Sequence, residues 1–197
     1  IQKHFKELDK RIDIQNSDKQ LNDLSKQFMN RSHLLKYSYN FNWLGRPIIQ
    51  YPQDIVNFQE IVFKVKPDLI IETGIAHGGS LILSASLLNL IDLMEGIDTK
   101  ESNRKVFGID VDIRSHNYKE IINHPFNNKI EMFQGSSIDQ SIFEEILKLS
   151  KSYDKILVCL DSNHTHKHVI RELDLYSKLV SKDSYCIVFD TVIEKMD

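Results

Sequence analysis

The stretch DLIIETGIAHGGS, residues 68–80, decides the fold of this 197-residue chain. Its apolar run at residues 69–71 is typical of a buried strand, and the run ends at an acidic residue and a turn rich in glycine. An apolar, helix-like segment follows at residues 81–94. This order predicts a nucleotide-binding corner, because the turn lets the backbone approach a ligand and the helix start offers unpaired N–H groups.

The residues of the turn indicate which ligand it binds. Gly74, Gly78 and Gly79 are spaced as GIAHGG, which does not fit the GxGxxG pattern that places a pyrophosphate on a helix dipole. Glu72, at the end of the strand, would repel a phosphate and attract a cationic amino group. We therefore expect S-adenosylmethionine, which carries an ammonium, a sulfonium and no phosphate, rather than NAD.

Composition excludes several classes of protein. The chain is 41% hydrophobic and 27% charged, which suits one core and one soluble domain. Its net charge of -3 and the lack of long basic runs argue against nucleic acid as a partner. No apolar stretch is long enough to span a membrane, and no signal peptide is found. Cys159 and Cys186 lie in apolar runs and suggest buried free thiols, so we expect a cytoplasmic protein with no membrane partner.

The chain divides into an N-terminal helical arm, residues 1–40, and a main domain, residues 41–197. The arm is polar and carries apolar residues at helical spacing: Ile12, Ile14, Leu21, Leu24, Phe28 and Met29. They should pack on the main domain or on another subunit. The next segment, FNWLGRPIIQYPQD, is typical of a loop, and Asp54 is expected to cap a helix that ends before Pro67.

Strand and helix patterns alternate through the rest of the chain. Strands are predicted at residues 69–71, 106–109, 130–133, 155–160 and 185–189, and helices at 81–94, 117–122, 140–149 and 167–180. Such alternation predicts an α/β fold with a doubly wound, mostly parallel sheet.

In such a sheet, ligands bind beyond the carboxyl ends of the strands, where this sequence places polar residues. Asp110 follows the second strand, where a carboxylate usually accepts hydrogen bonds from ribose hydroxyls. The alternative is a structural turn aspartate. Ser136 and Ser137 follow the third strand and would contact an adenine, although serine after glycine is also ordinary in turns. Asp161 follows the fourth strand and Asp190 the fifth.

Several of these runs together resemble a known family. RPIIQYPQD, PDLIIETGIAHGGSL, GIDVDIR, GSSID, LDSNHTHKHVIRELDLYSKLVSKDSY and VFDTV are similar to the cephalosporin hydroxylase and rhamnosyl O-methyltransferase family over residues 43–192. The resemblance implies a Rossmann-like, S-adenosylmethionine-dependent methyltransferase fold, a small-molecule substrate, a homo-oligomer, and a divalent metal, Mg²⁺, near Asp161 and Asp190. It also implies that the methyl donor is held by Glu72, Gly74, His77, Gly78, Ser80, Asp110, and Ser136 or Ser137.

The chain departs from the family at the end of the fifth strand. Two adjacent acidic residues are expected there, and this sequence has Phe189 followed by Asp190. Magnesium would then be held by Asp161, Asp190 and water, because it accepts water in place of a missing oxygen ligand. Alternatively, the strand register places Phe189 in the core. The two strands that normally close a methyltransferase sheet are not found before residue 197, so we expect the C-terminal strands to be missing from this chain.

Three histidines, His164, His166 and His168, follow Asp161 closely. A zinc site is disfavoured because the motif HExxH is lacking and no cysteine lies near. His164 is the candidate general base, since its pKa near neutrality suits deprotonation of a hydroxyl. His166 and His168 are expected on a solvated first turn, and Arg171, Glu172 and Asp174 on the polar face of the helix that follows.

The resulting hypothesis is a metal-assisted O-methyltransferase acting on a sugar hydroxyl or a small secondary metabolite, with Asp161 and His164 as catalytic residues. Two alternatives remain. One is a hydroxylase or oxygenase component, which would require an iron site of two histidines and one carboxylate. The other is a non-catalytic protein that binds S-adenosylmethionine and has lost its metal site, which the phenylalanine at position 189 would explain.

Overall fold

The computed structural model describes residues 2–191 and divides into two compact units, Ile1–Ser38 and Tyr39–Asp197. The first unit contains two helices, α1 (Gln2–Ser17) and α2 (Lys19–Leu34). Asp18 caps α2, because its Oδ1 accepts a hydrogen bond from the backbone N–H of Leu21 at 2.9 Å. Leu21 and Leu24 are 44% and 54% exposed, so their side chains leave an apolar stripe on α2 uncovered.

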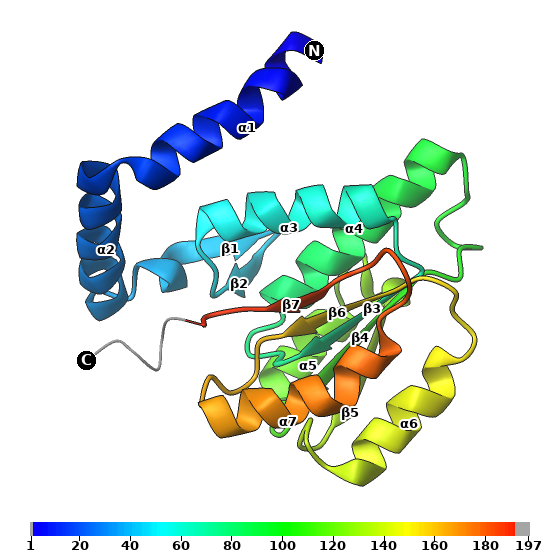
Figure 1. Cartoon of the computed structure of the whole chain (residues 1–197). Coiled ribbons are helices and arrows are strands. Elements are labelled where there is room, and N and C mark those ends of the chain that lie inside the picture. Colours follow the sequence, from blue (N-terminus) through cyan, green and yellow to red (C-terminus); the bar gives the residue numbers. More distant parts are fainter. Residues whose placement is uncertain (1, 192–197) are drawn as a thin grey trace. The chain divides into compact units, whose positions relative to one another are not determined.

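The second unit is built on five parallel strands (Figure 1). They are β3 (Leu69–Thr73), β4 (Lys105–Asp110), β5 (Ile130–Gln134), β6 (Ile156–Leu160) and β7 (Cys186–Val188). The order across the sheet is β5-β4-β3-β6-β7. The chain adds β4 and β5 on one side of β3 and then adds β6 and β7 on the other side, so the strand order switches between β3 and β6. This order confirms the predicted doubly wound α/β fold.

Alternate residues of the strands pack on opposite faces of the sheet. Ile70, Val106 and Leu157 belong to a core cluster with residues of α3 (Pro52–Val65), α4 (Gly79–Glu95) and α5 (Ser115–Ile122). Their neighbours in sequence, such as Ile71 and Phe107, belong to a second cluster with residues of α6 (Gln140–Ser150) and α7 (His166–Tyr176). Both faces are therefore covered by helices, which explains why the strands are apolar on both sides.

The segment that was expected to be a loop contains a β-hairpin. β1 (Phe41–Trp43) pairs antiparallel with β2 (Arg46–Ile48) through a two-residue turn at Leu44 and Gly45. Both turn residues have positive φ, +45° and +88°, which matches the twist of a tight hairpin. The expectation for Asp54 was also wrong: α3 begins at Pro52, and Asp54 lies in its first turn.

Buried charges are paired at the far end of α4. The Asp92 carboxylate accepts from Lys129 Nζ at 2.6 Å and from the Arg104 guanidinium, which also contacts Glu95 at 2.7 Å. Lys129 and Asp92 have no solvent exposure, so the pairing offsets the cost of removing both charges from water. This group joins α4 to the segments that precede β4 and β5.

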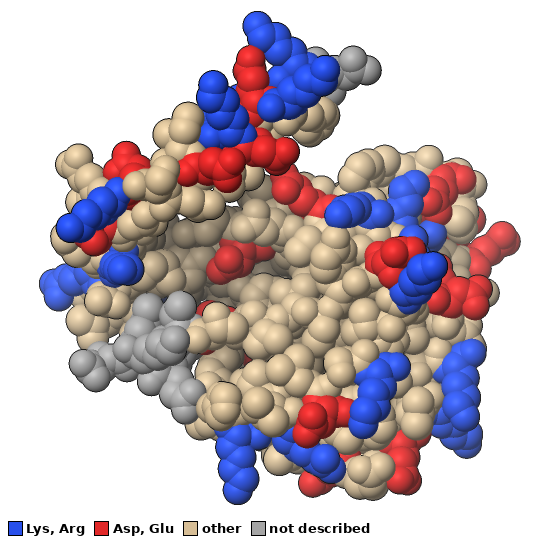
Figure 2. All heavy atoms as spheres, in the orientation of Figure 1, with Lys and Arg blue, Asp and Glu red and all other residues tan. Residues whose placement is uncertain are grey.

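Charged side chains on the visible surface are mixed in sign. Figure 2 shows lysine and arginine scattered among aspartate and glutamate on this face, with no continuous basic area. Among residues 2–191, no helix is long and apolar enough to cross a bilayer.

Candidate functional site

The candidate site lies at the carboxyl ends of β3, β6 and β7. Residues 74–78 turn from β3 into α4, and residues 161–165 turn from β6 into α7. Asp161 donates its backbone N–H to the Thr73 carbonyl at 3.0 Å, which joins the starts of these two turns. The change in strand order therefore brings the glycine turn and the Asp161 loop together, as the doubly wound fold requires.

The glycines of the turn permit close approach of backbone. Gly74 has φ +93°, and a Cβ at this position would lie 2.1 Å from the Asp161 carbonyl oxygen. Gly78 begins α4 with φ +83°, and a Cβ there would meet the Ile121 side chain. Gly79 is pressed against the Pro47 carbonyl of β2. Side chains are excluded at all three positions by neighbouring protein, so the turn is narrow because the fold packs it tightly.

Asp110 anchors the glycine turn. Its Oδ2 accepts hydrogen bonds from the backbone N–H groups of Ile75 at 2.8 Å and Ala76 at 3.2 Å, and its Oδ1 accepts from Asp112 at 3.0 Å. Each carboxylate oxygen has two lone pairs, so the same group retains capacity to accept from hydroxyls. Asp110 therefore has the structural role in the turn that was the alternative to a ribose contact. It lies at the end of β4, and its contact with a ribose stays a prediction.

Arg46 and Asn117, to which no role was assigned from the sequence, hold the turn from the other side. Arg46 donates from Nε to the His77 carbonyl at 3.0 Å and from Nη2 to Asn117 Oδ1 at 3.0 Å. Asn117 in turn donates to the Ala76 carbonyl at 2.9 Å. The RPII run marked Arg46 as part of the family resemblance, but its partners come from α5 and the glycine turn and are not adjacent in sequence.

Glu72 is buried, with 3% of its surface exposed. Its Oε2 accepts a weak hydrogen bond from Ser84 Oγ at 3.3 Å, and its Oε1 has no hydrogen-bond partner among residues 2–191. Burial raises the pKa of Glu72 to about 7, and the nearby hydroxyl groups of Ser80 and Ser84 offset part of that rise. An unpaired buried carboxylate oxygen favours a cationic donor at this position.

Two hollows meet at Asp161. One, lined in part by α3, is open to solvent and has a cavity volume of about 20 Å³; its lining includes Gln50, Asp54, Glu72, Ser80 and Phe189. The other follows the glycine turn, is also open to solvent and has a cavity volume of about 40 Å³; its lining includes Gly74, His77, Ser80 and Pro47. Of the predicted cofactor residues, Glu72, Gly74, His77 and Ser80 are therefore brought to the space around Asp161.

A group of possible metal ligands forms at the ends of β6 and β7. Asp161, His164 and Asp190 each offer one ligand atom, and these atoms lie within 4.8 Å of one another. His164 Nε2 lies 3.7 Å from Asp190 Oδ2, and Gln50 donates to Asp161 Oδ2 at 2.8 Å. Burial raises the pKa of Asp161 well above its usual range, and the nearby Asp190 and Glu72 raise it further. A buried carboxyl group whose pKa is raised further by a second carboxylate provides a fitting site for a divalent cation.

Phe189 and Asp190 point to different environments. The Phe189 ring packs on Phe58 of α3 with ring centroids 6.3 Å apart, against the core cluster on that face of the sheet. Asp190 is held at φ +54°, a conformation that aspartate tolerates better than most residues. This arrangement agrees with the alternative in which the strand register packs Phe189 against the core and leaves Asp190 at the cleft.

Ser136 and Ser137 lie in the turn after β5, and Ser137 is nearly buried. Ser137 Oγ lies 3.2 Å from His168 Nε2, and the same nitrogen lies 3.2 Å from Ser162 Oγ. Glu172, expected on the polar face of α7, is 1% exposed and was therefore placed wrongly. His168 and Glu172 are four residues apart on one helix, which was the signal that they form a pair.

Comparison with known proteins gives consistent results. A family model described as Rhamnosyl O-methyltransferase/CmcI matches residues 35–197. Rhamnosyl O-methyltransferase of Mycobacterium tuberculosis is 30% identical over 141 residues, which cover 71% of this chain and 52% of that protein. The Mycobacterium leprae protein of the same name is 28% identical over 150 residues, 76% of this chain and 59% of that protein. The chain thus spans about half the length of these relatives.

Solved structures share the fold. An apo structure of CmcI superposes with a TM-score of 0.54 at 22% identity, covering 79% of this chain and 59% of CmcI. A CmcI structure described as carrying Mg and SAM gives a TM-score of 0.54 at 18% identity, covering 79% of this chain and 60% of CmcI.

Proposed function

The chain belongs to the rhamnosyl O-methyltransferase/CmcI family, and on that premise we propose that it is an S-adenosylmethionine-dependent, divalent-metal-assisted O-methyltransferase. Its acceptor is a sugar hydroxyl or a small secondary metabolite. The observation that carries the proposal is the convergence of Asp161, His164 and Asp190 beside the glycine turn. The names of the relatives and the Mg and SAM of one CmcI structure support the same chemistry.

The cofactor would lie across the ends of β3, β4 and β5. Glu72 would accept a hydrogen bond from the ammonium group through its unpaired Oε1, and Asp110 would receive the ribose hydroxyls. The remaining predicted contacts, proposed as backbone or side-chain donors along the same edge, are Gly74, His77, Gly78, Ser80, Ser136 and Ser137.

Bound S-adenosylmethionine would supply an electrophilic methyl group, and magnesium would lower the pKa of the acceptor hydroxyl. Asp161 and Asp190 would hold the metal. Gln50 orients Asp161 through its 2.8 Å hydrogen bond, so that one oxygen of the carboxylate has a fixed direction. His164 would remove the acceptor proton at Nε2, which lies 3.7 Å from Asp190 Oδ2.

His164 has two possible roles, because its Nε2 also lies within reach of the metal ligand atoms. Magnesium prefers oxygen ligands, which favours His164 as a base, whereas manganese and zinc accept imidazole readily. The hydroxylase alternative required two histidines and one carboxylate. The cluster found among residues 2–191 has one histidine and two carboxylates, which favours the methyltransferase.

Manganese titration followed by electron paramagnetic resonance tests the metal site. We expect the full chain to bind one Mn²⁺ that Mg²⁺ displaces, and Asp161→Asn to weaken it by about tenfold or more, since a charged oxygen ligand is lost. Asp112→Asn, which changes an exposed carboxylate outside the cluster, should bind as the wild type does. Equal binding by all three proteins would contradict the assignment. Nitrogen coupling in the spectrum would identify His164 as a ligand rather than a base.

The setting of the enzyme is also a proposal. We propose a cytoplasmic homo-oligomer in which α2 contacts another subunit. Cys159 and Cys186 are both free thiols, and Cys159 is buried, which suits a reducing compartment. The exposed apolar side chains of α2 suit a subunit contact.

A further inference from the structure

Four side chains form a cluster behind the candidate site: Ser137, Ser162, His168 and Glu172. His168 is at its centre. Its Nε2 lies 3.2 Å from Ser137 Oγ, 3.2 Å from Ser162 Oγ and 3.5 Å from Glu172 Oε1. Ser162 also donates to Glu172 Oε1 at 2.6 Å, so the cluster is closed on itself. We call it the His168 cluster.

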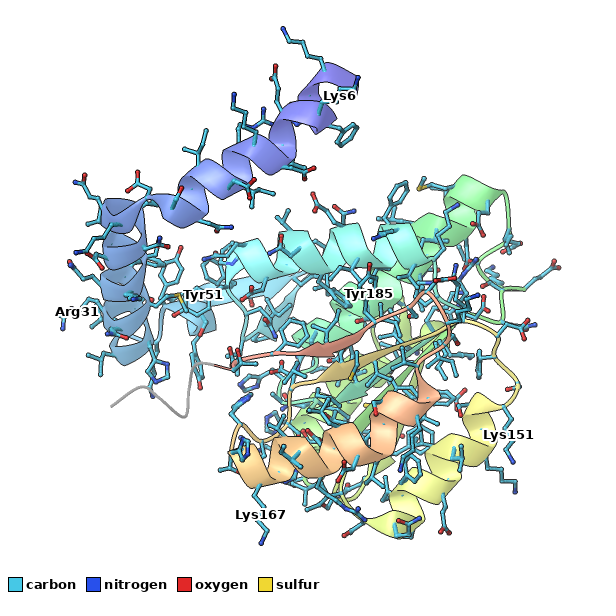
Figure 3. All side chains as sticks on the ribbon, in the orientation of Figure 1. Lys6, Arg31, Tyr51, Lys151, Lys167 and Tyr185 are labelled. Atoms are coloured by element: carbon cyan, nitrogen blue, oxygen red, sulfur yellow. The ribbon has the colours of Figure 1, made fainter. Side chains whose placement is uncertain are left out.

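Ser137 and Glu172 are the buried members of the cluster, whereas His168 is partly buried and Ser162 is exposed. Glu172 is 1% exposed, and its Oε2 has no hydrogen-bond partner in the described part of the chain. A carboxylate so buried depends on its few partners, because loss of any of them leaves charge or polarity without compensation. The Tyr176 hydroxyl donates a hydrogen bond to the Ser137 carbonyl at 2.9 Å and so holds the turn after β5. Neighbouring Lys167, by contrast, points away from the sheet (Figure 3).

The two serines of the cluster belong to different loops of the site. Ser137 lies in the turn after β5, which is proposed to contact the cofactor, and Ser162 directly follows Asp161, which is proposed to hold the metal. Both hydroxyls share one nitrogen. A displacement of either loop must therefore change the hydrogen bond available to the other loop.

We propose that His168 and Glu172 are positioning residues that couple the turn after β5, residues 135–139, to the Asp161 loop, residues 161–165. Through this coupling, a divalent cation at Asp161 tightens binding of the cofactor. The inference rests on the proposed function and adds to it a link between the two ligands. His168 touches neither ligand in this account and acts through Ser137 and Ser162. By linkage, the cofactor must tighten metal binding by the same factor.

Calorimetric titration of S-adenosylhomocysteine into the full chain, with and without Mg²⁺, measures this coupling. We expect magnesium to tighten binding about five- to tenfold in the wild type, a usual size for coupled sites, and less than about twofold in His168→Ala. His168→Gln places an amide near the position of Nε2 and should recover most of the factor. His166→Ala, which changes an exposed histidine on the same turn, should behave as the wild type.

A purely structural role for His168 predicts a different pattern. Thermal unfolding of the same proteins would show a lower melting temperature for His168→Ala, while the magnesium factor stayed unchanged. That result would overturn the proposal, as would a wild-type protein in which magnesium has no effect on S-adenosylhomocysteine binding.

Hydrogen exchange of the ligand-free proteins separates this inference from the proposed function. In His168→Ala, peptides that contain residues 135–139 and 161–165 should both exchange faster, by about tenfold, because both loops lose their shared contact with the ring nitrogen. Faster exchange in only one loop, or in neither, would refute the coupling. If both loops loosen but the wild type does not bind S-adenosylhomocysteine, the structural link stands and the methyltransferase proposal fails.

Discussion

At the scale of residues, the site is defined by carboxylates in unfavourable surroundings. Glu72 has one oxygen without a partner among residues 2–191, and burial together with Asp190 raises the pKa of Asp161. Such groups destabilise a fold unless a ligand compensates them, which is common in functional sites. Asp190 is also held at positive φ.

The pKa of Glu72 makes stability depend on pH. Burial raises it from 4.5 to about 7, so between these values the folded state binds a proton that the unfolded state has lost. This stabilising contribution is therefore complete below about pH 4.5 and disappears as the pH rises through about 7. Glu72→Gln should gain stability relative to the wild type over that range, by at most about 3 kcal/mol.

Urea unfolding of both proteins at pH 5, 6, 7 and 8 measures this difference. The gap between Glu72→Gln and the wild type should widen with pH. A gap of constant size would show that the pKa of Glu72 is the same in the folded and unfolded states, and would contradict the burial cost described for this carboxyl group.

Phe189 gives a second prediction at this scale. Its ring packs on Phe58 and the core, so Phe189→Glu would place a carboxylate in apolar surroundings. We expect a loss of about 2 kcal/mol or more in the free energy of unfolding, and no gain in metal affinity. Phe189→Leu, which preserves apolar packing, is the control and should lose about 1 kcal/mol. Tighter Mg²⁺ binding by a stable Phe189→Glu protein would instead reveal a degenerate metal site at this position.

At the scale of elements, the turn between β3 and α4 positions the site through tight backbone contacts. Gly74 lies against the Asp161 carbonyl, and a Cβ there would approach it to 2.1 Å. Gly45, in the turn of the hairpin, has a similar φ of +88° but open space around it. The two glycines form a matched pair in which only one has a close neighbour.

Alanine substitution of each glycine separates strain from crowding. Gly45→Ala should cost about 1 kcal/mol for positive φ alone, whereas Gly74→Ala adds a backbone clash and should cost about 3 kcal/mol or more. Chemical denaturation measures both. Equal losses would mean that the β3 and β6 turns are free to separate, which would weaken the description of the site.

The element scale also shows what the sequence could predict. The five strands and the helices between them were predicted within a few residues, because their apolar runs are long and bounded by glycine, proline or acidic residues. The hairpin was missed because its turn uses leucine at positive φ, where asparagine or glycine is the usual signal, and because Pro47 lies in a strand. Arg46 and His168 were missed as partners because their contacts with Asn117 and Ser137 join different elements, whereas the pairing of His168 with Glu172 could have been predicted from their spacing on one helix.

At the scale of the whole molecule, the family resemblance over residues 43–192 is confirmed by the family model, which matches residues 35–197. Most of the first unit, Ile1–Ser38, lies outside that match. One or two helices were predicted there from apolar spacing, and the structure has two; their packing on the main domain or on another subunit stays a prediction. Residues 192–197, which include part of the VFDTV run, lie outside the described residues.

The α2 stripe provides a test of the subunit contact. Leu21→Gln combined with Leu24→Gln replaces two exposed apolar side chains without removing core packing. If α2 joins subunits, the mass measured by light scattering should fall toward that of a single chain, because the apolar contact is lost. Gln20→Ala is a control on the same helix. An unchanged mass in the double variant would exclude this stripe as the contact.

Calorimetric titration measures whether the site binds S-adenosylmethionine with the help of a divalent metal. S-adenosylmethionine and NAD are each titrated into the full chain with and without Mg²⁺. We expect saturable binding of one S-adenosylmethionine per chain, tighter with Mg²⁺, and no binding of NAD, because the glycine turn lacks a phosphate site and Glu72 and Asp161 favour cations. Binding of NAD without binding of S-adenosylmethionine would contradict this expectation.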